Sequence, residues 1–245
     1  MKQLHELINR DDPGWPLVQQ WVAEATNPVD VLPPPDDAAR ERALIDTQVT
    51  TRSPMGAIIY ECGGIIVDYG WLRLLGSGHP RLPRSLPSWN FKRSFSAAGQ
   101  PPPFLLIADD VVGGFFAVDG GGLRLEPGKV CYFAPRTLAW ESTDLGYSDF
   151  LVWCFRGDLA KYYEDVRWPG WQVETREVRG DQAFSIYPLL SSSGPPGVRS
   201  ASPRFTICMW ARLHEQVFTK AVELVRCGCD ESRHQDERFF DNLSF

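Results

Sequence analysis

The residues best suited to catalysis gather around one loop. His79 follows a Gly-Ser-Gly run at the end of a strand-like apolar segment, and a histidine in such a loop can serve as a general base. The side chains that would complete the site are the nucleophiles Cys62 and Ser77 and the orienting acids Glu61 and Asp68. The sequence alone does not bring these groups together, and a lone loop histidine is usually structural. A small hydrolase-like enzyme is therefore the alternative interpretation, and a protein without catalysis is preferred.

Three aspartates offer oxygen ligands for a hard cation. Asp109, Asp110 and Asp119 bracket a glycine-rich hairpin, but their spacing fits no EF-hand loop. Aspartate is also the residue expected at tight turns, where its side chain accepts hydrogen bonds from neighbouring amides. We interpret the three acids as turn residues, and the sequence predicts neither a metal nor a cofactor.

Protein recognition is a further chemistry that the sequence offers. Residues 76–103 form a long Pro-rich loop that carries basic side chains and a tryptophan. Exposed aromatic side chains in loops are typical of binding surfaces, although packing beneath the loop is equally compatible. The predicted binding surface joins this loop to the neighbouring hairpin and consists of Arg81, Arg84, Trp89, Asp109 and Asp110.

The elements that must position these residues are clearest around the three aspartates. Short apolar runs at 104–108, 114–118 and 129–133 follow one another, and each break carries Asp, Gly or Pro. Connections this short exclude crossover helices, so the runs should pair as an antiparallel meander. A hairpin of residues 65–68 and 71–75 precedes the meander, and a strand at 137–141 follows it.

Helices are predicted before, between and after these strands in the sequence, at residues 17–26, 36–47, 86–92, 148–155, 158–166 and 173–188. Residues 53–61 suit a short helix, although 57–60 would also suit a strand. The predicted fold class is α+β, with a twisted antiparallel sheet packed by helices over residues 1–190. Residues 191–203, rich in Ser, Gly and Pro, predict a flexible linker before a helical tail at 204–245, whose amphipathic helix spans 206–226.

Composition excludes several classes of function. A net charge of -6 argues against general nucleic-acid binding. The first residues do not resemble a secretory signal, and no apolar run reaches the roughly 18 to 20 residues of a membrane span. Six cysteines are too few for a disulfide-rich scaffold, and Cys227 and Cys229 with His234 supply only part of a zinc site. We expect a soluble cytoplasmic protein without a membrane partner; the sequence does not indicate its oligomeric state.

Long segments resemble a known bacterial family. Residues 49–90 read VTTRSPMGAIIYECGGIIVDYGWLRLLGSGHPRLPRSLPSWN, and the meander FLLIADDVVGGFFAVD and the turn RWPGW at 167–171 strengthen the likeness. These strings are similar to the uncharacterised family DUF2625, which is defined only as a domain of unknown function. The resemblance covers roughly residues 1 to 190. It implies no particular activity.

A more distant resemblance is to the SUKH superfamily of bacterial immunity and scaffold proteins. It rests on two strand patterns, in which Ile107, Ala108, Asp110, Gly113, Gly114 and Asp119 match the first and Gly128, Val130 and Tyr132 the second. This resemblance implies a helix-backed antiparallel sheet and a role in protein binding. The function expected from it is a protein-binding module of immunity or toxin-neutralising type, whose partner is a protein such as a toxin.

Overall fold

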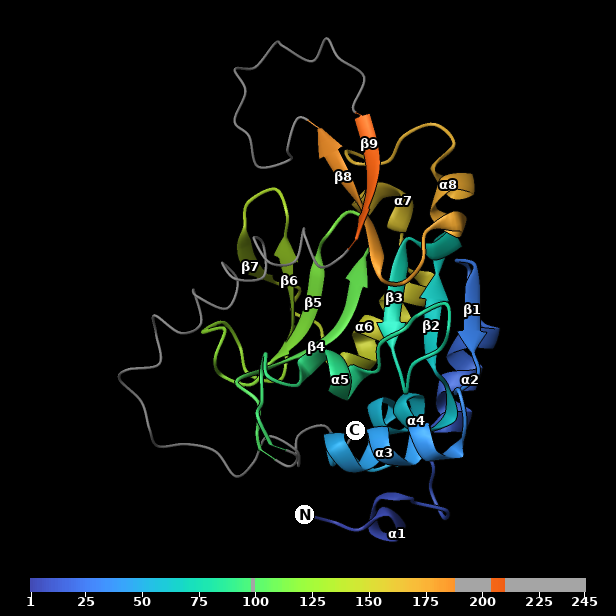
Figure 1. The fold of residues 1–245 in the computed structure, drawn as a ribbon, viewed down its shortest axis with the longest axis vertical. Helices are drawn as coiled ribbons and strands as arrows, with labels where there is room; N and C mark the ends of the chain where they lie inside the picture. The colour runs from blue at the N-terminus through green and yellow to red at the C-terminus, as the bar shows by residue number, and fades with distance from the viewer. Residues whose placement is uncertain (98–99, 188–203, 210–245) are drawn as a thin grey trace.

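The computed structural model describes residues 1–97, 100–187 and 204–209, and in them the chain forms an α+β fold (Figure 1). One sheet of seven strands runs in chain order, and each strand is antiparallel to its neighbours. The strands are β1 (Val29–Leu32), β2 (Gly64–Val67), β3 (Leu72–Leu75), β4 (Phe104–Asp110), β5 (Phe115–Asp119), β6 (Val130–Ala134) and β7 (Ala139–Ser142). The predicted antiparallel sheet packed by helices is confirmed, with the meander at its centre.

The helices begin where side chains can cap them. Asp36 accepts a hydrogen bond from the N–H of Ala39 at the start of α3, and Ser53 accepts one from Gly56 at the start of α4. The α4 cap resolves the choice between helix and strand in favour of a helix. The helices are α1 (Leu4–Leu7), α2 (Trp15–Ala23), α3 (Asp37–Thr47), α4 (Pro54–Glu61), the 3₁₀ turn η1 (Asp68–Gly70), α5 (Leu86–Asn90), α6 (Tyr147–Arg156), α7 (Leu159–Tyr162) and α8 (Trp171–Glu177).

Two of the three meander aspartates, Asp110 and Asp119, hold its turns, whereas Asp109 pairs with arginines and is not the turn residue that was predicted. Oδ1 of Asp110 accepts hydrogen bonds from the backbone N–H groups of Val112 (3.1 Å) and Gly114 (2.7 Å). Asp119 ends β5, and its carboxylate accepts from the amides of the glycine-rich loop that follows, those of Gly121, Leu123 and Leu125. Both carboxylates therefore act as hydrogen-bond acceptors for turn amides that the local backbone carbonyls do not pair.

A β-bulge in β4 decides which face of the sheet each later residue occupies. The register with β5 shifts between Leu106 and Ala108, so Ile107 is an extra residue on β4. The amide of Asn90 in α5 covers the irregular place, because it accepts from the N–H of Leu106 and donates to its carbonyl, each at 2.8 Å. The bulge is thus held by a buried side chain from outside the sheet.

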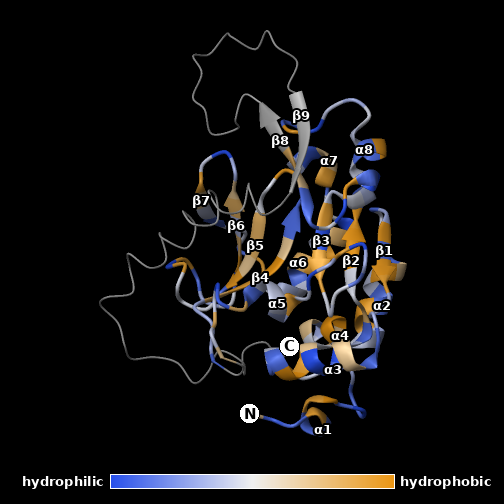
Figure 2. Ribbon diagram, in the orientation of Figure 1, coloured by the Kyte–Doolittle hydropathy of each residue, from blue (hydrophilic) through white to orange (hydrophobic). Residues whose placement is uncertain are grey.

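Beyond the bulge, consecutive aspartates point to opposite faces of the sheet. Asp109 lies on the face that α5 covers, where Trp89 packs edge-on against Phe115, the cross-strand neighbour of Asp109. Asp110 lies on the face that α6 covers, where Phe150 contacts Phe116. In Figure 2, β4 is hydrophobic along most of its length and hydrophilic at the arrowhead, where the two aspartates end it. Both carboxylates are fully buried.

The segment after α8 differs from the prediction. The expected helix over 173–188 ends at Glu177, and residues Gln182–Tyr187 form strand β8. Its backbone is fixed from outside: the N–H of Phe184 donates to the carbonyl of Val111, and the Phe184 ring is buried against Trp168. Tertiary contacts therefore override the local helical pattern.

The C-terminal prediction is wrong where it can be compared. The start of the expected helix at 206–226 falls in β9 (Arg204–Met209), which pairs antiparallel with β8. The remaining positions of that helix and the linker at 191–203 lie outside the described residues. Because β8 and β9 come from either side of the predicted linker, they connect the two parts into which we divided the chain. That division stays a prediction. In residues 1–97, 100–187 and 204–209, no helix has the length and apolar character that crossing a membrane requires.

Candidate functional site

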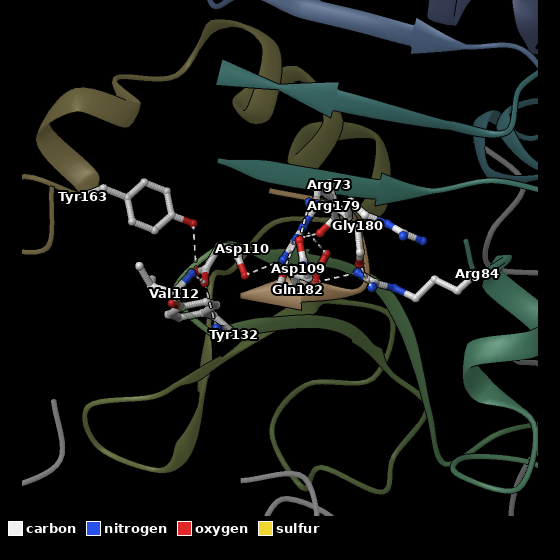
Figure 3. Close-up of polar contacts among 11 residues, drawn as sticks. Arg73, Arg84, Asp109, Asp110, Val112, Tyr132, Tyr163, Arg179, Gly180 and Gln182 are labelled. Carbon is white, nitrogen blue, oxygen red and sulfur yellow. Dashed lines mark hydrogen bonds and ion pairs between the residues drawn. The ribbon is translucent and has the colours of Figure 1, made fainter. Parts of the chain in front are cut away.

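Asp109 is the centre of a buried charged network (Figure 3). Its two oxygens accept from Nε and Nη2 of Arg73 at 3.2 and 2.8 Å, the parallel geometry that makes arginine–carboxylate pairs strong. Oδ2 also accepts from Nη2 of Arg84 at 2.5 Å. The side chain of Arg73 is 2% exposed, and that of Asp109 is completely buried. One buried carboxylate is therefore shared by two guanidinium groups.

Arg73 uses its whole guanidinium group inside the fold. Besides Asp109, Nη2 donates to the carbonyl of Asp110 at 3.0 Å, and Nη1 donates to the carbonyls of Gln182 (2.7 Å) and Arg179 (3.4 Å). A guanidinium has five N–H donors, and these contacts occupy all of them. Arg73 therefore ties the connection between α8 and β8 to the sheet, and it has no donor left for a ligand.

Arg84 closes the same network from the Pro-rich loop. It donates to the carbonyl of Gly180 and lies over the indole ring of Trp89, 4.8 Å from its centroid. Burial lowers the pKa of Arg84 to about 10, while the charge of Asp109 opposes that shift. Arg84 thus anchors the long Pro-rich loop to the sheet, and this explains why the loop packs against the fold.

Asp110 has neutral partners on the opposite face. Besides the two turn amides, its Oδ2 accepts from the hydroxyls of Tyr132 (2.7 Å) and Tyr163 (3.3 Å) (Figure 3). Burial raises the pKa of Asp110, and hydrogen bonds from Tyr132 and Gly114 limit the rise. Burial and the neighbouring Asp110 raise the pKa of Tyr132 well above its ordinary value. The two tyrosines therefore remain protonated donors.

A surface depression lies beside the Asp109 network. It has a volume of about 400 Å³ and is bounded by the start of β1, Ile66 of β2, the turn at Tyr69, and residues 175–180. Arg73 reaches its inner wall and Arg81 its rim. We call it the arginine depression. Its size lies within the range of ordinary ligand sites.

The backbone at one wall of the arginine depression is strained. Asp68 and Tyr69 both have positive φ angles, 52° and 60°, which non-glycine residues seldom adopt. Two contacts fix them there: Arg167 forms an ion pair with Asp68, and the hydroxyl of Thr175 donates to the carbonyl of Tyr69 at 2.9 Å. Such strain concentrates at functional sites and directs attention to the side chain that it presents, Tyr69.

The rim of the arginine depression carries exposed charges of both signs. Arg81 forms an ion pair with Asp30 at 2.5 Å, and both side chains are more than half exposed. Arg176 lies over the ring of Tyr69, 4.4 Å from its centroid. Among the described residues, the side chain of Arg176 makes no hydrogen bond or ion pair, and it is exposed. Arg179 contacts Asp181 through Nε at 3.4 Å and is 62% exposed.

The residues of the predicted catalytic loop do not meet through their side chains in the described contacts. Nδ1 of His79 accepts from the N–H of Arg81 at 3.1 Å, so the neutral ring carries its proton on Nε2. The Cys62 thiol donates to the carbonyl of Ile58, and burial raises the pKa of this thiol to about 12. The Ser77 hydroxyl donates to the carbonyl of Cys62. Catalytic roles for these residues stay predictions.

Among the described residues, neither of the predicted orienting acids, Glu61 and Asp68, forms a hydrogen bond or ion pair with His79. Glu61 is the last residue of α4 and is half-buried, whereas Asp68 is paired with Arg167. Burial raises the pKa of Asp68, and the charge of Arg167 opposes the rise. Asp68 therefore serves the strained turn beside the arginine depression.

The predicted binding surface is mostly interior. Trp89 is 5% exposed, and the side chains of Asp109 and Asp110 are fully buried, because the sheet needs cover on both faces. Arg84 is largely buried beside them, and Arg81 alone of the five is well exposed. The expectation of an exposed surface at these positions is therefore wrong for Trp89, Asp109 and Asp110. Whether any of the five contributes to binding stays a prediction.

Sequence reasoning missed Arg73, Tyr69, Arg176 and Arg179. Arg73 carried one usable signal, since it is a lone charge within the apolar run that became β3. A charge in such a place needs a buried partner, and the acids of β4 were the nearest candidates. The described residues contain no group of three or more His, Cys, Asp or Glu side chains arranged to hold a metal ion.

Comparison with known proteins identifies the family. The family model described as protein of unknown function DUF2625 matches residues 4–207, and the chain belongs to this family. It is 47% identical over 190 residues to a putative uncharacterized protein, YbfG, of Escherichia coli strain K12, an alignment that covers 78% of this chain and 86% of the relative. It is 42% identical over 191 residues to an uncharacterized protein of Haemophilus influenzae, covering 78% of this chain and 83% of that one. No solved structure matches the chain significantly.

Proposed function

We propose that this protein is a non-catalytic binding module whose partner is another protein, and that the partner docks at the arginine depression. The observation that carries this proposal is a contrast in how the arginines are used. Arg73 and Arg84 are buried and bound by the fold, whereas Arg81, Arg176 and Arg179 are exposed around the hollow. Exposed guanidinium groups beside an aromatic ring are typical of protein interfaces.

The geometry of the catalytic candidates favours binding over catalysis. A nucleophilic cysteine acts as a thiolate, and the raised pKa of Cys62 keeps its thiol protonated at neutral pH. A neutral His79 that accepts at Nδ1 carries a proton at Nε2 and has no free basic nitrogen. The arrangement therefore lacks an activated nucleophile and a base positioned to generate one.

The more specific form of the proposal is a cytoplasmic protein that neutralises a toxin. Its support is the distant resemblance to the SUKH superfamily, together with a helix-backed antiparallel sheet of the kind that the resemblance implies. The net charge of -6 would steer a basic partner towards the molecule as a whole. At the arginine depression itself, the local charge would select an acidic part of that partner.

The test is retention of partners from a lysate of the native host on the immobilised full chain. We expect one or more proteins to be retained by the wild type and lost with the variant R176E/R179E. The matched control is K161E, which reverses an exposed charge on α7. Equal retention by wild type and R176E/R179E would overturn the docking site. For the toxin form, the retained protein should stop growth when expressed alone and cease to do so when this chain is co-expressed.

A further inference from the structure

We infer that the arginine depression binds a carboxylate group of its partner, carried next to an apolar or aromatic group. This inference rests on the proposed function, because it names the chemistry that the partner presents at the same site. The donors of the rim, the apolar wall and the balance of charge all favour such a group.

Arg176 supplies a hydrogen-bond donor group that is already positioned in the absence of a ligand. Its guanidinium lies over the Tyr69 ring, 4.4 Å from the centroid, and Tyr69 in turn packs edge-on against Trp171. This contact restrains the guanidinium while its N–H donors remain available, and planar paired donors match a carboxylate. The Arg176 guanidinium is thus restrained before the ligand binds.

Arg81 and Arg179 extend the site from two other segments. Each makes an ion pair of which both partners are partly or mostly exposed, with Asp30 and Asp181 respectively. Exposed pairs contribute little to stability, so a ligand carboxylate can exchange for the protein carboxylate at low cost. The backbone that carries Arg179 is held by Arg73, which donates to the Arg179 carbonyl. Only the side chain of Arg179 therefore has to move when a ligand binds.

The wall of the arginine depression is apolar where it meets the sheet. Val29 and Ile66 line it from β1 and β2, and Val178 and the Tyr69 ring line it from the opposite segments. A volume of about 400 Å³ exceeds what one carboxylate fills. The ligand group is therefore larger than acetate, and an apolar or aromatic neighbour of the carboxylate uses the remaining space.

The charge of the lining indicates a single negative charge. The arginines of the depression and of the adjoining Asp109 network number five, Arg73, Arg81, Arg84, Arg176 and Arg179, and the acids beside them number four, Asp30, Asp109, Glu177 and Asp181. The excess is one positive charge. A phosphate dianion would exceed this charge, whereas a single carboxylate balances it.

The test is a titration of the full-length ¹⁵N-labelled protein followed by NMR, with phenylacetate, its neutral isostere phenylacetamide, and inorganic phosphate as probes. Phenylacetate should shift the amide signals of residues 69–70 and 175–180 saturably, with an affinity about tenfold higher than that of phenylacetamide or phosphate. R176Q should weaken phenylacetate about fivefold or more, and the control K161Q should not change it. Equal affinity for phenylacetate and phenylacetamide, tighter binding of phosphate, or no effect of R176Q would overturn the inference.

Two short peptides identify the source of the carboxylate. One carries a glutamate beside a phenylalanine and has both ends blocked, and the other ends in phenylalanine with a free C-terminal carboxylate. Displacement of phenylacetate by the first indicates an acidic side chain, and displacement by the second indicates a chain terminus. Failure of both peptides to displace phenylacetate would overturn the assignment of the carboxylate to a protein partner.

The two proposals fail separately. If phenylacetate binds through Arg176 but R176E/R179E retains the same proteins as the wild type, the carboxylate site stands and protein docking there is wrong. If protein retention depends on these arginines but phenylacetate and phenylacetamide bind equally, docking stands and the carboxylate inference is wrong.

Discussion

Asp109 and Asp110 are consecutive, equally buried and chemically identical, yet the fold treats them differently. Asp109 faces two arginines and forms ion pairs, whereas Asp110 faces tyrosine hydroxyls and backbone amides. Only the direction of the side chain differs between them. The comparison shows that the face of the sheet, rather than the residue type or its local sequence, determines how a buried carboxylate is stabilised.

The largest expected effect is that of D109N. Removing the charge leaves the guanidinium of Arg73, which is 2% exposed, and that of Arg84 without a buried counterion. Breaking a buried ion pair from one side costs about 3 to 5 kcal/mol of unfolding free energy. Urea unfolding followed by tryptophan fluorescence measures it. The control is D30N, which breaks the half-exposed pair with Arg81 and should cost about 1 kcal/mol or less. Similar costs for the two variants would remove the distinction between the buried and exposed pairs.

The second effect concerns the residue that holds the bulge. N90A removes four hydrogen bonds, two with the backbone of Leu106 and one each with Leu86 and Ser94. Because the Leu106 groups are buried, we expect a loss of about 2 to 4 kcal/mol. S94A, which removes one of the four bonds, should cost about 1 kcal/mol. Thermal and urea unfolding of both variants test this order, and an N90A cost no larger than that of S94A would contradict it.

D110N should be milder and should depend on pH. The asparagine oxygen can still accept from Val112 and Gly114, but the amide NH2 in place of Oδ2 no longer accepts from the two tyrosine hydroxyls, so at neutral pH we expect a loss of up to about 1.5 kcal/mol. Burial raises the pKa of Asp110 above its value in the unfolded chain. The wild type is therefore stabilised relative to D110N below the unfolded pKa near 3.8, and this advantage declines as pH rises through the folded pKa. Unfolding measured from pH 4 to 8 should show that decline; a wild-type advantage that grows with pH would reverse the assignment.

The smallest effects are expected from the tyrosines. Y132F removes a hydrogen bond of 2.7 Å to Asp110, and Y163F removes one of 3.3 Å to the same oxygen. We expect Y132F to cost about 1 kcal/mol and Y163F about half of that, because long hydrogen bonds are weak. Urea unfolding at pH 7 compares them. In the background of D110N the difference between the two should shrink, and its persistence would indicate that packing rather than Asp110 distinguishes them.

Sequence patterns predicted those parts of the fold that short-range chemistry determines. The meander followed from turns of Asp and Gly, and α3 followed from the acids at its start. Ser53 suited the start of α4, although residues 57–60 were also compatible with a strand, a choice that the cap resolves. β1 was missed because its four residues give no alternation long enough to recognise, and it is a strand because β2 pairs with it. The candidate site was missed for a similar reason. Arg176 and Arg179 lie on a segment that tertiary contacts place against β1 and β2, more than a hundred positions away in the chain.

The bulge at Ile107 has a consequence for the evolution of this family. Losing one residue between Leu106 and Asp109 would remove the bulge, and Asp109 would still pair with Phe115 and face the arginines. Losing or gaining a residue where no bulge absorbs the change would instead exchange the faces of the two acids, bringing Asp110 to the arginines and Asp109 to the tyrosines. Deletions in β4 should therefore be confined to the bulge, and a relative with a shorter strand should also lack the amide that Asn90 supplies to it.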